Sequence, residues 1–185
     1  MTPAVGHTVA MTDATPTDQS ASPQMGHGTK QRDLIRMSGA EVDEFLAGRH
    51  SATMSTLAAD GSIHSVAMWY GFVGGVMAVE TKAKAQKVLN LRRDPRITML
   101  VEDGEYYEEL RGVSLVGTAE IVDDTDRLWE LGVSVFDRYM GGYTEEMKPF
   151  VEVMLHNRVA VLVHPTKVVT WDHRKLGLPS TRPAE

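Results

Sequence analysis

Three lysines stand close together near the middle of the chain, and their type and spacing suit the binding of an anion. Lys82, Lys84 and Lys87 lie within six residues after Thr81. The segment from there to Pro95 predicts a short basic helix between two strands, with Thr81 as its N-cap and the proline as its stop signal. The helix dipole disfavours cations at this end, so their presence indicates a site for an anion such as a phosphate. A solvated basic face is the alternative interpretation.

Composition limits the classes of function. The chain has 185 residues, of which 42% are hydrophobic, enough for one domain with a proper core. The formal net charge of -6 argues against a general nucleic-acid partner and makes the lysine cluster a local exception. The sequence has no cysteine, which excludes disulfides, thiolate metal sites and cysteine nucleophiles. We find no membrane-spanning apolar run and no secretory signal, and therefore expect a cytoplasmic protein without a membrane partner.

The N-terminal segment differs in composition from the rest. Residues 1–32 are rich in Thr, Ala, Pro and Ser and show no apolar periodicity. Such a segment buries too little surface to offset the entropy of ordering, which predicts a disordered tail. We expect one folded domain over residues 33–176 and a loose C-terminal extension over 177–185.

The order of predicted elements indicates a mainly β fold with flanking helices (α+β). A capping box of Ser38 and Glu41 begins the first helix. Antiparallel strands precede any helix-connected parallel unit, which favours a meander or barrel over a doubly wound sheet. Further helices are predicted over 125–139 and from Thr144, with Phe150, Val153 and Met154 on the apolar side of the latter. Strands are predicted over 50–57, 63–72, 76–80, 96–102, 110–122, 158–163 and 167–171, with a bend at Gly117 and a turn at His164-Pro165.

Side chains for direct acid, base or nucleophilic chemistry do not form a recognisable pattern. The sequence lacks a nucleophile elbow, a two-histidine zinc motif and a P-loop. Its histidines are scattered, and Glu105, Glu108 and Glu109 suit a solvated loop. We therefore predict no catalytic side chain and no metal site, and expect that a bound cofactor carries the reaction.

Several segments together resemble the pyridoxamine-5'-phosphate-oxidase-like superfamily. The similarity runs in order from about residue 37 to 175, and is most specific in Asn-Leu-Arg-Arg-Asp-Pro (90–95) and Trp-Asp-His-Arg-Lys-Leu (171–176). Within the superfamily the chain is most similar to the actinobacterial flavin/deazaflavin oxidoreductases of the B branch. The resemblance implies a split β-barrel homodimer with two cofactor sites at the dimer interface.

The same resemblance implies which residues bind the cofactor. Thr81 and Lys87 would hold the phosphate of FMN or of a deazaflavin, with Lys82 and Lys84 as additional ligands of the anion. The backbone of the second strand would lie along the ring. The implied ring-side residues are Val66, Ala67, Met68 and Trp69. We further expect Trp171, Arg174 and Lys175, near the C-terminal end, to close the pocket from the partner subunit.

Two local features refine this prediction. Trp69 and Tyr70 are neighbours on a strand and point to opposite faces, so we expect Trp69 in the pocket and Tyr70 in the core. The oxidases of the family have an arginine where this chain has Val66, which favours a deazaflavin over pyridoxamine phosphate oxidation. The leading hypothesis is an oxidoreductase that uses coenzyme F420 (F420H2) to reduce a small conjugated or aromatic substrate. The alternatives are an FMN enzyme, or a non-catalytic flavin- or haem-binding protein with His64, Met68 or His173 as a haem ligand.

Overall fold

The computed structural model describes residues 30–48 and 50–183. Residues 1–29 of the expected tail, and residues 184–185, lie outside the described residues. Within the described part, no helix is long and apolar enough to cross a membrane.

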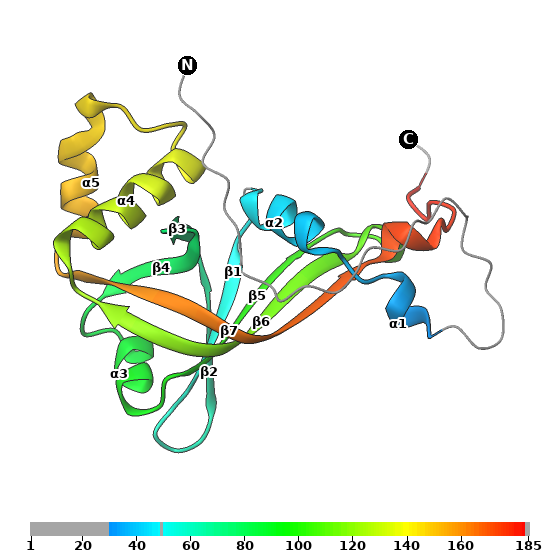
Figure 1. Ribbon diagram of the computed structural model, residues 1–185, viewed down its shortest axis with the longest axis horizontal. Helices are drawn as coiled ribbons and strands as arrows, with labels where there is room; N and C mark the ends of the chain where they lie inside the picture. The colour runs from blue at the N-terminus through cyan, green and yellow to red at the C-terminus, as the bar shows by residue number, and fades with distance from the viewer. Residues whose placement is uncertain (1–29, 49, 184–185) are drawn as a thin grey trace.

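Seven antiparallel strands form one sheet in the order β2-β1-β5-β6-β7-β4-β3, which curls into a half-barrel (Figure 1). The sheet confirms the expected mainly β fold with flanking helices. The strands are β1 (Ala52–Leu57), β2 (Ile63–Met68), β3 (Gly71–Val73), β4 (Val76–Lys82), β5 (Arg96–Asp103), β6 (Arg111–Val122) and β7 (Arg158–Asp172). The helices are α1 (Gln31–Leu34), α2 (Gly39–Ala47), α3 (Gln86–Arg93), α4 (Thr125–Tyr139) and α5 (Lys148–Leu155), with 3-10 turns η1 (Tyr107–Glu109), η2 (Glu145–Met147) and η3 (His173–Leu176).

The strand expected over residues 63–72 is divided into β2 and β3, which lie at opposite edges of the sheet. The chain leaves the β-ladder at Trp69 because side chains of α4, rather than a neighbouring strand, accept hydrogen bonds from the backbone amides that follow. Tyr70 N donates to Tyr139 Oη at 3.4 Å, and Phe72 N donates to Ser134 Oγ at 3.0 Å. The fully buried Tyr70 side chain confirms its predicted place in the core.

The two closing strands predicted around His164-Pro165 are a single strand, β7. Gly117 pairs with Pro165 and Val116 pairs with Lys167, so Thr166 is an extra residue in a β-bulge. The bulge accommodates a proline that cannot donate to the ladder. A Cβ on Gly117 would lie 2.1 Å from the carbonyl oxygen of His164, so this close approach requires glycine. The sequence predicted a bend of this strand at Gly117, and the pairing of β6 with β7 changes register between Val116 and Gly117.

The sequence predicted the start of α2 correctly but not the buried side of α5. The capping box on α2 is confirmed, since Glu41 N donates to Ser38 Oγ and Ser38 N donates to Glu41 Oε2. The predicted apolar side of α5 is wrong, because Phe150 and Val153 are 66% and 76% exposed. The helix instead packs Val151 and Leu155 against Gly132 of α4, where the two helices approach closely.

The C-terminal extension is held against η1, contrary to the expected loose end. Thr181 Oγ1 donates to Glu108 Oε2 at 3.0 Å, and Arg182 forms an ion pair with Glu109 at 3.0 Å. Glu108 is consequently buried, so its expected place in a solvated loop is also wrong. These contacts hold Thr181 and Arg182 against η1, which directly precedes β6.

Candidate functional site

The basic helix begins later than the sequence indicated. α3 starts after Ala85, which provides no side-chain cap, and Thr81 lies in β4. The predicted N-cap role of Thr81 is wrong because β4 continues its pairing with β7 through Lys82. Of the three lysines, only Lys87 lies in the first turn of α3, so the argument from the helix dipole applies to Lys87 alone.

The structure nevertheless brings Thr81 and Lys87 together. Lys87 Nζ donates to the buried Thr81 Oγ1 at 3.2 Å. Lys82 Nζ donates to the carbonyl oxygen of His156 at 2.9 Å, and Lys84 is exposed in the turn before α3. Burial, and then the nearby Arg158 guanidinium, lower the pKa of the Lys87 ammonium. Positive charge is therefore crowded here, as an anion site requires.

A pocket of about 430 Å³ adjoins this cluster. It is lined by Ala67, Met68, Trp69, Glu80, Met154 and Arg158. These residues come from the end of β2, the corner after it, β4, α5 and the start of β7. The pocket thus contains three of the four residues expected beside a ring. The fourth, Val66, packs its side chain against the main core.

Trp69 forms an aromatic wall of the pocket. Its ring stacks on that of Tyr139 with a centroid distance of 4.7 Å and an interplanar angle of 3°. The side chain is still 47% exposed. Tyr139 is itself fixed, since its hydroxyl donates to the carbonyl oxygen of His50 at 2.6 Å. The core therefore holds the indole in place beside the pocket.

Glu80 and Arg158 form an ion pair in the same pocket that the sequence did not reveal. Glu80 is 8% exposed, and its Oε1 lies 3.6 Å from Arg158 Nη1. Its Oε2 has no hydrogen-bond partner among the described residues, and neither does Arg158 Nε. Burial raises the pKa of the Glu80 carboxyl, although the charges of Arg158 and Lys82 oppose the rise. The only sequence signal was the position of Arg158 at the start of a strand, and its pairing opposite Lys82 could not be predicted.

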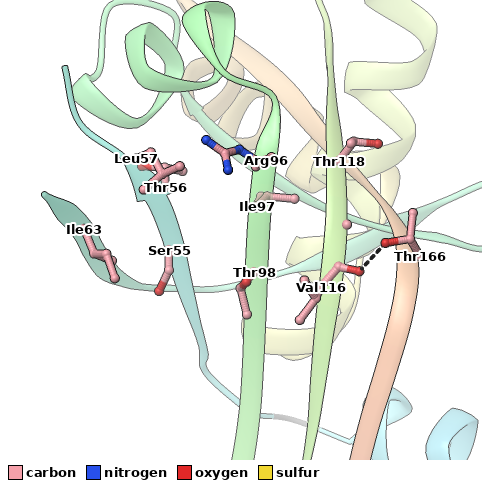
Figure 2. A pocket seen from close by; sticks show the side chains of 11 residues that line it. Ser55, Thr56, Leu57, Ile63, Arg96, Ile97, Thr98, Val116, Thr118 and Thr166 are labelled. Atoms are coloured by element: carbon pink, nitrogen blue, oxygen red, sulfur yellow. Dashed lines mark hydrogen bonds between the residues drawn. The ribbon is translucent and has the colours of Figure 1, made fainter. Parts of the chain in front are cut away.

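A second hollow, of about 420 Å³, lies on the outer face of the sheet (Figure 2). Ser55, Ile63, Thr98 and Val116 contribute to it from four strands. Ile63 is 71% exposed and Val116 is 38% exposed. This face of β2, β1, β5 and β6 presents apolar surface that no element of the described chain covers.

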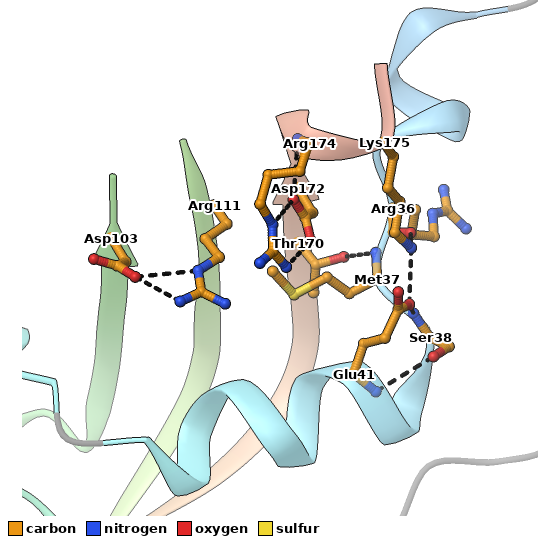
Figure 3. Close-up of polar contacts among 10 residues, drawn as sticks. All are labelled: Arg36, Met37, Ser38, Glu41, Asp103, Arg111, Thr170, Asp172, Arg174 and Lys175. Atoms are coloured by element: carbon orange, nitrogen blue, oxygen red, sulfur yellow. Dashed lines mark hydrogen bonds and ion pairs between the residues drawn. The ribbon is translucent and has the colours of Figure 1, made fainter. Parts of the chain in front are cut away.

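Trp171 and Lys175 lie at the other end of β7 from the lysine cluster. Thr81 pairs with Val159 near the start of this long strand, whereas Trp171 pairs with Gly112 near its end (Figure 1). Lys175 Nζ donates to the carbonyl oxygen of Arg36 at 2.7 Å and to Glu41 Oε2 at 2.8 Å (Figure 3). One chain therefore does not bring these two residues to the pocket, and their predicted role depends on a partner subunit.

The possible haem ligands are dispersed. His64 and Met68 lie on β2, and Met68 packs partly against the core. His173 lies in η3, where its Nδ1 is 2.8 Å from the carbonyl oxygen of Tyr107. No cluster of three or more metal-binding side chains occurs among residues 30–48 and 50–183.

Comparison with known proteins identifies the family of this fold. A sequence profile described as pyridoxamine 5'-phosphate oxidase matches residues 38–172. The chain belongs to this family. The expected superfamily is thereby confirmed. A comparison with functionally curated proteins found no match.

Three solved structures illustrate the relationships of this pyridoxamine 5'-phosphate oxidase family member. The conserved hypothetical protein Rv2991 from Mycobacterium tuberculosis is 48% identical, with a TM-score of 0.80 over 85% of this chain and 98% of that chain. A protein described as an F420 reductase is 27% identical, with a TM-score of 0.55 over 68% of this chain and 94% of that chain. A haem-binding protein from Mycobacterium smegmatis is 18% identical, with a TM-score of 0.54 over 77% of this chain and 61% of that chain, and shows the shared fold alone.

Proposed function

We propose that this protein is an oxidoreductase that binds coenzyme F420, a deazaflavin, and uses it to reduce a small conjugated or aromatic substrate. The observation that carries the proposal is the cation cluster beside an aromatic-walled pocket. Lys87 donates a hydrogen bond to Thr81, and the nearby charge of Arg158 lowers its pKa. Arg158 and Trp69 both line the pocket. A solved structure 27% identical to this chain is named an F420 reductase, which supports F420 as the ligand.

The residues present fit such a group. A phosphate held by Thr81 and Lys87 would relieve the repulsion between Lys87 and Arg158. Lys82 and Lys84 extend the positive surface along the end of β4, which suits a cofactor with further acidic groups. When bound, the deazaflavin would supply the hydride. The chain's own contribution would be to orient the ring along the backbone of residues 66–69 and to exclude water from it.

The proposal includes a homodimer, because one chain separates the two parts of the expected site. The uncovered outer face of the sheet, with Ile63 and Val116 exposed, offers apolar surface for a second copy. Trp171 and Lys175 would then approach the pocket of the partner subunit. The cofactor sites would be complete only in the assembled dimer.

A parallel titration with F420 and with FMN tests the cofactor assignment. The native protein, Lys87→Ala and the control Arg92→Ala are titrated by fluorescence. Arg92 lies at the exposed C-terminal end of the same helix, so its replacement removes an equal charge away from Thr81. We expect Lys87→Ala to weaken binding by tenfold or more, or about 1.4 kcal/mol, and Arg92→Ala to have less than a threefold effect.

Two results would contradict the assignment. If Lys87→Ala and Arg92→Ala weakened cofactor binding equally, Lys87 would contribute only its positive charge and no specific contact. Tighter binding of FMN than of F420 by the native protein would replace the deazaflavin with the flavin as the cofactor, within the same site.

A further inference from the structure

One wall of the pocket beside Trp69 carries a guanidinium whose hydrogen-bond donors are not all engaged. Arg158 lines this pocket, and its side chain is 28% exposed. Its Nη1 lies 3.6 Å from Glu80 Oε1, which is an ion-pair contact but too long for a hydrogen bond. The two Nη groups therefore keep donors for another acceptor. The planar fork of a guanidinium matches a carboxylate, which it binds with two parallel hydrogen bonds.

The charge around this wall has a positive surplus. Glu80 is the only acidic residue among the described residues that line the pocket. Lys82 lies two residues further along β4 and pairs with Arg158 across the β4–β7 ladder. Lys87 contributes a third cation, since burial and then the charge of Arg158 lower its pKa. One buried carboxylate thus stands against three cations, and a negatively charged ligand would balance them.

The remaining walls of the pocket are flat or apolar. One face of the Trp69 indole stacks on the Tyr139 ring at an interplanar angle of 3°, and the side chain is still 47% exposed. A planar ring can therefore stack on the free face of the indole. Met68 and Met154 add polarisable apolar surface to the same space. The pocket thus combines a platform for a conjugated ring with a single fixed cation.

We propose that this pocket binds a planar conjugated carboxylic acid as the substrate, with its ring on Trp69 and its carboxylate on Arg158. The inference rests on the proposed function and names the chemical class of its substrate. The cofactor ring is expected along the backbone of residues 66–69, which leaves the side-chain walls for the substrate. Glu80 holds the guanidinium at the pocket wall, and the substrate accepts the hydrogen bonds that Glu80 does not. Arg158 would therefore make the site prefer an acid to its neutral analogue.

The test compares trans-cinnamate with trans-cinnamamide, which has nearly the same shape but no charge. Binding to the full-length protein is measured by isothermal titration calorimetry without cofactor. We expect the native protein to bind cinnamate at least tenfold more tightly than cinnamamide. Arg158→Gln should reduce this preference to less than threefold, whereas the control Arg92→Gln, at the exposed end of α3, should keep it. Trp69→Leu should weaken the binding of both probes by threefold or more and leave their ratio unchanged.

A double variant keeps the test valid if Arg158→Gln fails to fold. That replacement leaves the buried Glu80 carboxylate without its counter-ion, which is strongly destabilising. Glu80→Gln/Arg158→Gln removes both charges and should also lose the preference for cinnamate, with a native circular dichroism spectrum. Three results would overturn the proposal: equal binding of the two probes by the native protein, no binding of either at millimolar concentrations, or an unchanged preference in the folded double variant.

Cofactor titrations separate this inference from the proposed function. The double variant should bind F420 within threefold of the native protein, because Arg158 is assigned to the substrate. A tenfold loss of F420 affinity would overturn that assignment and place Arg158 on the cofactor. If the native protein binds neither F420 nor FMN, the proposed function fails, while the comparison of cinnamate with cinnamamide still tests the carboxylate site.

Discussion

Replacement of Arg138 tests the contact that joins α4 to α2. The guanidinium donates to three backbone carbonyl oxygens at the end of α2, at 3.1 Å to Leu46, 3.1 Å to Ala47 and 2.6 Å to Gly48. It also lies 4.5 Å above the ring centroid of the buried Tyr70. Arg138 therefore donates hydrogen bonds to the carbonyl groups at the C-terminal end of α2 and holds α4 against that end. It also packs over the ring of Tyr70, the residue that follows Trp69.

The size of the effect follows from these contacts. Each hydrogen bond contributes about 1 kcal/mol, and the guanidinium above Tyr70 adds about 0.5–1 kcal/mol. We expect Arg138→Ala to lower the free energy of unfolding by about 3 kcal/mol after partial hydration of the carbonyl groups. With a urea m-value of about 2 kcal/mol/M, the midpoint should fall by about 1.5 M. The measurement is urea unfolding followed by far-UV circular dichroism at a fixed protein concentration.

Arg127→Ala provides the matched control on the same helix. Arg127 pairs with Glu120 at 3.0 Å, but both side chains are more than 40% exposed. Exposed pairs contribute at most about 1 kcal/mol, so the control should shift the midpoint by less than about 0.5 M. A loss below 1 kcal/mol for Arg138→Ala, or equal losses for the two variants, would refute the view that Arg138 joins the helices.

Two further predictions concern pH and assembly. The raised pKa of Glu80 in the folded state means that the native state holds a proton that the unfolded state releases. Stability from this group is present below its unfolded pKa and is lost as pH rises through the folded pKa, so Glu80→Gln should gain on the native protein toward neutral pH in urea unfolding. Ile63→Asp should place a charge on the uncovered sheet face and convert the proposed dimer to monomers in light scattering; a native protein that is monomeric at all concentrations would contradict the dimer.

Local signals in the sequence predicted much of the fold. The capping box of Ser38 and Glu41 lies within four residues, and both of its hydrogen bonds are present. The helix predicted over residues 125–139 is α4, and the Asp124 side chain caps its first turn. The strands β1, β4 and β5 lie within two residues of their predicted bounds, because apolar residues and flanking turn residues mark them locally. Such features are determined by neighbours in the chain, so a single sequence reveals them.

The errors arose where distant segments decide the structure. The basic helix was started too early because β4 is extended by pairing with β7, which lies far along the chain. The same pairing brings Arg158 to Glu80 and completes the pocket. A Thr followed by lysines is compatible with either a helix start or a strand end. The sequence contains no local signal for the choice, and so the pocket's ion pair could not be predicted.

The bulge at Thr166 determines which side chains of β7 face inward. Before it, the odd-numbered Val161 and Val163 pack in the main core, and after it the even-numbered Val168 does so. One additional residue thus reverses the alternation for the second half of the strand. Without it, Asp172 would turn outward and Trp171 would turn inward. Deletion of Thr166, about 15 Å from Trp171 along the strand, would therefore turn the C-terminal side chains of β7 to the opposite faces of the sheet. The residues that the resemblance assigns to the partner's site would then point the wrong way, although none of them had been replaced.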